Sequence, residues 1–145
     1  DRDGLKLGFV DSRLWSAFSR MMNSDIGRFY LESVIESDMV FNYYLELTKT
    51  AAGHTGSALP MCVQNQPVET YISPLVARAS RIPMLALVVH ETIHNSNFAR
   101  REVPLANLGP GAILSEELST QQQTEQVMNE LVGFPYRATT EQFGP

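Results

Sequence analysis

The strongest constraint on this chain is a six-residue apolar run, residues 84–89, that leads directly into the sequence HETIH at residues 90–94. The run is hydrophobic all round, and a helix of this kind is normally buried. Two histidines and a glutamate at the end of a buried helix need partners, because burying unpaired polar groups is unfavourable. Ser80 and Pro83 suit the start of this helix. The pattern therefore predicts a central helix with a functional site at its polar end.

The spacing of the two histidines indicates a metal site. Residues i and i+4 of a helix lie on one face about 6 Å apart, so His90 and His94 can present their imidazoles to one ion. Glu91 lies one step round the helix, where its carboxylate can reach a metal-bound water. This is the H-E-x-x-H arrangement of zinc metalloproteases, in which zinc activates water and the glutamate transfers its proton. We expect His90 and His94 to bind Zn²⁺ and Glu91 to be the general base.

A catalytic zinc site needs a third protein ligand and keeps its fourth position open. His54 is the only other histidine and lies in a Gly-rich segment, where we interpret it as a surface residue. The third ligand is therefore expected from the acidic segment 113–133. Glu125 is our first choice because it shares a helix face with apolar residues expected to point to the core. Glu117 and Glu130 are the alternatives. The expected core-facing stripe is Leu118, Met128 and Val132.

The remaining hydrophobic pattern predicts a small α+β fold made of one domain, residues 1–145. A helix should start at Asp11 or Ser12, and a second should cover residues 28–37. Alternation of apolar residues predicts strands at residues 39–47 and 68–73. Residues 48–60 and 101–112 are expected to be loops, and Gly133 should end a helix over residues 113–132. We expect a zincin-like metalloprotease fold, with a short β-sheet packed on the central H-E-x-x-H helix.

Two further segments could contribute to catalysis. Residues 68–73 could form an exposed edge strand to which a substrate peptide adds by main-chain hydrogen bonding. The alternative is a strand that is paired on both sides and has no substrate role. Tyr136 or Arg137 could reach the cleft and stabilise an oxyanion. The alternative for these two residues is a structural or simply exposed position.

Composition excludes several classes of partner. The formal net charge is -5 and no basic block occurs, so neither nucleic acid nor an anionic membrane is an expected partner. The longest apolar run is too short to span a bilayer. Cys62 is the only cysteine, which prevents an intramolecular disulfide and fits a reducing compartment. We expect a monomer that acts on a protein or peptide substrate.

Four stretches of the sequence resemble a family of bacterial zinc metallopeptidase effectors delivered by type III secretion, the family of the non-LEE-encoded effector D. "NSDIGRFYLESVIESDMVFNYY" is similar to the family's helix, glycine, helix and strand entry. "VETYISPLVARASRIPMLALVVHETIHNSNF" is similar to its strand, Pro-bearing linker and metal helix. "EELSTQQQTEQVMNELVGFP" corresponds to an acidic segment that ends in Val-Gly, and "TTEQ" resembles a turn near the family's C-terminus. The resemblance covers most of the chain from Asn23 onward.

The resemblance implies zinc ligation by His90 and His94, with Glu91 as general base. The family's acidic pair lies closer to Val-Gly than any glutamate pair here, and Glu125 is the nearest glutamate without being in register. Family members cut host signalling kinases, which implies secretion into a host cell and action in its cytoplasm. We therefore expect a zinc-dependent endopeptidase. The alternatives are a non-catalytic, zincin-like effector module that binds protein, and a zinc hydrolase with a non-peptide substrate.

Overall fold

The computed structural model describes residues 12–37, 39–45, 53–56, 68–73, 81–101 and 108–133, and the statements below refer to these residues. The elements in chain order are α1 (Ser12–Met21), α2 (Asp25–Ile35), β1 (Phe41–Tyr44), β2 (Gly53–Gly56), β3 (Val68–Ile72), α4 (Arg81–Arg101) and α5 (Pro110–Val132). The described part of the chain is mostly helical with one small sheet, which confirms a small α+β fold. No helix among these residues is long and apolar enough to cross a membrane.

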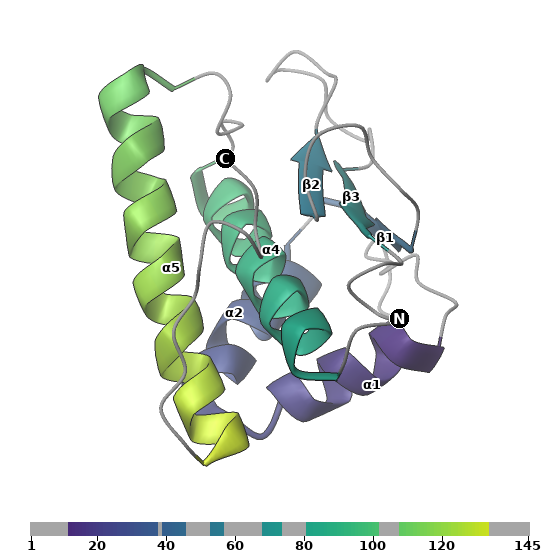
Figure 1. The fold of residues 1–145 in the computed structure, drawn as a ribbon. Helices are drawn as coiled ribbons and strands as arrows, with labels where there is room; N and C mark the ends of the chain where they lie inside the picture. The colour runs from purple at the N-terminus through teal and green to yellow at the C-terminus, as the bar shows by residue number, and fades with distance from the viewer. Residues whose placement is uncertain are drawn as a thin grey trace.

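Helix α4 is the centre of the structure. Figure 1 shows α4 between α5 and the sheet, with α5 running antiparallel to it. The other helices and strands β2 and β3 also contact α4. All six residues of the apolar run 84–89 are buried, as expected for a helix that is hydrophobic all round. The prediction of a buried central helix is confirmed, and its polar end is surrounded by other elements.

The sheet differs from the expectation in two respects. Strand β2 lies within residues 48–60, where we expected a loop, because "GHTG" has none of the β-branched and aromatic enrichment that marks a strand. The strand order is β1-β3-β2, so β3 is the middle strand. It pairs in parallel with β1 (Phe41 opposite Val68) and antiparallel with β2 (Gly53 opposite Ile72). Of the two alternatives for residues 68–73, the structure therefore shows the strand that is paired on both sides and not the exposed edge strand.

A buried hydrogen-bond network attaches the sheet to α4. The Asn95 side-chain amide donates to the Tyr43 hydroxyl at 2.9 Å and to Thr70 Oγ1 at 3.0 Å. The Tyr43 hydroxyl also lies 2.9 Å from Thr92 Oγ1. Tyr43 belongs to β1, Thr70 to β3, and the other two residues to α4. Burial raises the pKa of Tyr43, so its hydroxyl keeps its proton. The network fixes the sheet against the turn of α4 that carries His94.

Close packing of α1, α2 and α5 depends on one glycine. Ser24 caps α2, accepting a hydrogen bond at 3.0 Å from the backbone N–H of Gly27. A Cβ at Gly27 would lie 2.7 Å from the Met21 carbonyl oxygen and 3.2 Å from Val127 Cγ1. Only glycine therefore allows this approach without movement of the backbone.

Several expectations on the helices are confirmed. Helix α1 begins at Ser12, and α5 ends before Gly133, whose φ of 74° is the left-handed conformation of a helix C-cap. Helix α5 begins at Pro110, so the last residues of the expected loop 101–112 are helical. Ser80, Cys62, Tyr136 and Arg137 lie outside the described residues.

Replacement of Gly27 by alanine should destabilise the protein by about 1–3 kcal/mol, because the added methyl group overpacks this contact. Alanine otherwise favours helix formation over glycine by about 1 kcal/mol. The matched control is Gly111→Ala in α5, where nothing lies within 4 Å of the added Cβ. We expect that control to be neutral or slightly stabilising in urea unfolding. Equal effects at the two positions would contradict the packing described here.

Candidate metal centre

His90 and His94 lie on one face of α4, as their spacing predicts. Both side chains are buried, and their rings pack edge to face with centroids 4.8 Å apart and an interplanar angle of 77°. Helix α5 crosses α4 at this level and brings two adjacent glutamates to the pair. The site is therefore built by two antiparallel helices, with both histidines on one and the carboxylates on the other.

His94 lies between two carboxylates. Its Nδ1 atom is 2.7 Å from Glu116 Oε2, and its Nε2 atom is 2.6 Å from Glu117 Oε1. Each ring nitrogen thus has its own acceptor at hydrogen-bond distance. The Glu116 side chain is only 9% exposed, whereas that of Glu117 is 35% exposed. The two glutamates therefore differ in environment, although they are neighbours in the sequence.

His90, His94 and Glu117 could together hold a metal ion, since one ligand atom from each lies within 4.8 Å of the others. Two imidazoles and one carboxylate are a ligand set that zinc accepts. Zinc bonds of about 2.0–2.2 Å place two ligand atoms about 3.4 Å apart. The 2.6 Å contact between His94 Nε2 and Glu117 must therefore lengthen by about 0.8 Å, and separations of up to 4.8 Å within the group must shorten by up to about 1.4 Å. The residues fit a zinc ion with these side-chain adjustments.

The structure brings Glu117, rather than Glu125, to the histidine pair. Glu125 is eight residues further along α5, which places it about 12 Å away along the helix axis. Glu130 lies further still and accepts a hydrogen bond at 2.6 Å from the Ser24 hydroxyl. Our choice of Glu125 as third ligand therefore does not fit the geometry, and the alternative Glu117 does.

The expected core face of α5 is confirmed only in part. Met128 is buried, whereas Leu118, which we placed on the same face, is 54% exposed. The buried side of α5 is formed by Thr120, Thr124, Val127 and Met128. Glu117 and Glu116 lie three and four residues before Thr120, so both continue this buried face. The spacing of the two threonines was the sequence signal that could have identified them.

The environment shifts the pKa values of His94, His90 and Glu117. Burial alone would lower the pKa of His94, but hydrogen bonds with Glu116 and Glu117 outweigh it and raise the pKa to about 10. Burial lowers the pKa of His90, against the attraction of Glu91 and Glu117. The hydrogen bond with His94 lowers the pKa of Glu117. With no metal bound, the proton between His94 Nε2 and Glu117 therefore occupies the position where a metal would bind. His90 stays neutral, which is the form that can ligate a metal.

Glu91 is buried beside the pair without belonging to the metal-binding group. Electrostatic attraction from Glu91 acts to raise the pKa of both His90 and His94. The role of Glu91 as a base that does not ligate the metal stays a prediction from the H-E-x-x-H pattern.

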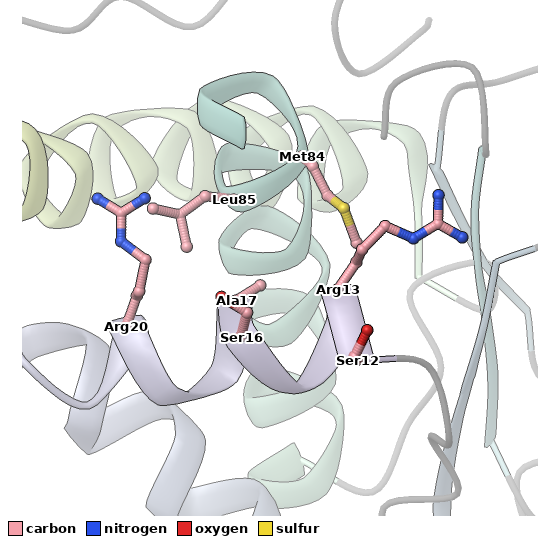
Figure 2. A pocket seen from close by; sticks show the side chains of 7 residues that line it. All are labelled: Ser12, Arg13, Ser16, Ala17, Arg20, Met84 and Leu85. Carbon is pink, nitrogen blue, oxygen red and sulfur yellow. The ribbon is translucent and has the colours of Figure 1, made fainter. Parts of the chain in front are cut away.

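A groove of about 380 Å³ lies elsewhere, between α1 and the start of α4. In Figure 2, Arg13 and Arg20 lie at its two ends, and Leu85 is the lining residue nearest in sequence to the histidines. Leu85 precedes His90 by five residues, about 7.5 Å along the helix axis. No member of the metal-binding group lines this groove, so it is separate from the candidate site.

Comparison of the chain with known proteins found no matching family model, no matching curated protein and no matching solved structure.

Without metal, the folded protein should lose stability as the pH rises from neutral to alkaline values. The pKa of His94 is raised from 6.5 to about 10, so its stabilising contribution is complete below pH 6.5 and lost as the pH rises through 10. In EDTA, we expect the free energy of unfolding in urea to fall between pH 7 and 10, by at most about 1.4 kcal/mol per pH unit. His94→Asn should flatten this slope. An identical slope in that variant would show that the pair of carboxylates does not hold a proton on His94.

Proposed function

We propose that this protein is a zinc-dependent endopeptidase. The observation that carries the proposal is the convergence of His90, His94 and Glu117 on one point, with Glu91 beside them as a base that is not a ligand. Three protein ligands leave the fourth position of a tetrahedral zinc open to water or substrate, as in catalytic rather than structural sites. The H-E-x-x-H sequence and the observed geometry support the same chemistry.

Each residue of the site has a separate role in this proposal. His90 Nε2 or Nδ1, His94 Nε2 and a Glu117 oxygen would hold the ion. When bound, zinc lowers the pKa of a water molecule and polarises the carbonyl group of the substrate. Glu91 accepts the proton of the attacking water and delivers it to the leaving amine. Burial of these groups beside α5 limits competing water and strengthens their electrostatic interactions.

Glu116 orients a ligand without binding the ion. Its carboxylate accepts a hydrogen bond from His94 Nδ1 at 2.7 Å, which leaves Nε2 as the nitrogen that faces the metal position. A carboxylate in this place also makes the imidazole a stronger ligand. Glu116 is nearly as buried as His94, so solvent does not compete for this hydrogen bond.

Strands β1 and β2 are the two edges of the sheet among the described residues, and β2 contacts α4. An extended peptide could add to β2 by main-chain hydrogen bonds. The sequence resemblance to effector proteases further suggests a host signalling protein, such as a kinase, as substrate, with action in the host cytoplasm.

A non-catalytic, zincin-like module that binds protein is the second candidate. The observation that favours it is the contact of His94 with Glu116 and Glu117, because it joins α4 to α5 without any metal. In that case His94 stabilises the packing of α4 against α5 and has no catalytic role. Zinc content and cleavage activity distinguish the two candidates.

Purified protein reconstituted with zinc should hold one ion and cleave casein. Glu91→Gln should keep the ion and lose at least about 100-fold in kcat, because it removes the general base. Glu117→Gln should lose zinc on dialysis, since it replaces a charged ligand with a neutral amide. Glu125→Gln, with the same charge change on the same helix, should behave as wild type in both assays.

Two results would contradict the proposal. Wild type that retains no zinc under these conditions would remove the metal site. Zinc retention without cleavage of casein or of a mixed peptide library would support the non-catalytic candidate. Loss of zinc in Glu125→Gln, with retention in Glu117→Gln, would restore our first choice of third ligand.

Glu116→Gln should weaken zinc binding by about 10–100-fold, the usual effect of removing a hydrogen-bond partner of a metal-bound histidine. The measurement is the zinc dissociation constant from competition with a chelator at pH 7. Circular dichroism checks that the variant is folded. A dissociation constant equal to that of wild type would show that Glu116 has no influence on His94 as a ligand.

A further inference from the structure

The groove between α1 and the start of α4 has a cationic rim and an apolar floor. Its volume of about 380 Å³ is that of an ordinary ligand site. The floor is formed by three buried apolar side chains, Ala17 of α1 with Met84 and Leu85 of α4. The rim is formed by polar and charged side chains of α1: Ser12, Arg13, Ser16 and Arg20. The groove therefore offers both charge and apolar surface to a ligand.

The charge of the groove has the opposite sign to that of the whole chain. The sequence has 16 acidic residues against 11 lysines and arginines. Helix α1 nevertheless contains no acidic residue, and α4 contains none before Glu91. Among the described residues, no acidic side chain lines the groove. A local positive surface of this kind attracts anionic groups to a protein that otherwise repels them.

The two arginines are separated by the floor. They are seven residues apart, which places Arg13 and Arg20 on nearly the same side of α1, about 10.5 Å apart along its axis. Figure 2 shows Ser16 and Ala17 between them on α1, with Met84 and Leu85 on the facing helix. A ligand that lies along the groove thus meets a cation, an apolar surface and a second cation in that order.

This order selects among anionic ligands. A small anion such as phosphate would contact one arginine and leave the floor in water. A nucleic acid would bring closely spaced phosphates to a chain with a net charge of -5, and two arginines offer it few contacts. The matching ligand carries two anionic groups on either side of an apolar one.

From this arrangement we infer that the groove is a docking site for an extended acidic peptide of a partner protein. In an extended chain, alternate side chains lie on one face at about 3.3 Å per residue. The pattern acid-x-apolar-x-acid therefore places two carboxylates about 13 Å apart with an apolar side chain midway. This span suits two arginines at opposite ends of the groove, because each guanidinium can bind a carboxylate through two hydrogen bonds. The inference needs neither zinc nor catalysis, so it goes beyond the proposed function.

The probe is the capped peptide Ser-Glu-Thr-Leu-Thr-Glu-Ser, titrated into the ¹⁵N-labelled full chain and followed by NMR. We expect a dissociation constant below about 1 mM, with the largest shifts in α1 and at residues 84–85. A peptide with both glutamates replaced by glutamine should bind at least about 10-fold more weakly, since it loses two ion pairs. Replacement of its leucine by serine should weaken binding at least about 5-fold, because the floor is no longer covered.

Variants of the rim test the two ends separately. Arg13→Gln and Arg20→Gln should each weaken binding about 3-fold, and each should remove the effect of only one peptide glutamate. Arg28→Gln is the matched control, because it makes the same charge change at an exposed arginine of α2. Ser16→Glu puts a negative charge between the two arginines and should weaken binding at least about 5-fold. Ser19→Glu, on the same helix but outside the groove lining, should have little effect.

Three results would overturn the docking site. The first is wild type that shows no saturable shifts in α1 up to about 5 mM peptide. The second is binding that Arg13→Gln and Arg20→Gln weaken no more than Arg28→Gln does. The third is tighter binding of decanedioate than of the peptide, which would assign the groove to a small dicarboxylate. Glu117→Gln separates this inference from the proposed function, since it should leave peptide binding unchanged whether or not it loses zinc.

Discussion

The contact of His94 with Glu116 and Glu117 is the interaction on which the site depends. It joins the two longest helices, and it puts a carboxylate on each nitrogen of one imidazole. A buried histidine between two carboxylates keeps its proton unless another cation takes its place. A divalent cation can replace the proton at His94 Nε2, beside Glu117, which is the more exposed of the two glutamates. Metal binding and proton release are therefore linked at Nε2, while the Glu116 hydrogen bond at Nδ1 can persist in both states.

The surrounding fold places the two carboxylates of this contact in different environments. The hydrogen-bond network of Asn95, Tyr43 and Thr70 fixes the sheet against one side of α4, and Ser24 of α2 donates a hydrogen bond to Glu130 near the end of α5. Of the two glutamates that contact His94, Glu117 has the more exposed side chain, 35% against 9% for Glu116. A single asymmetry, the difference in burial between two adjacent glutamates, thus separates the carboxylate that orients a ligand from the one that can bind the ion.

Sequence reasoning located the part of the site that depends on local spacing. His90, Glu91 and His94 lie on one helix, so their arrangement follows from the helical repeat, and the apolar run 84–89 predicts their burial. Glu117 depends on the rotation of α5 against α4, which the sequence encodes only weakly. The buried face of α5 is marked by Thr120 and Thr124, whereas Leu118, a stronger hydrophobic signal, points to solvent. Strand β2 was missed for a similar reason, because its pairing with β3, and not its Gly-rich composition, makes it a strand.

The most direct test of the metal site is an anomalous difference map at the zinc edge from crystals grown with zinc. The account predicts one peak within bonding distance of His90, His94 and Glu117, with Glu116 on His94 Nδ1 and no protein atom in the fourth position. No peak at the histidine pair would contradict the central claim. A fourth protein ligand would make the site structural, and a peak bound by Glu116 or Glu125 in place of Glu117 would refute the assignment of the third ligand.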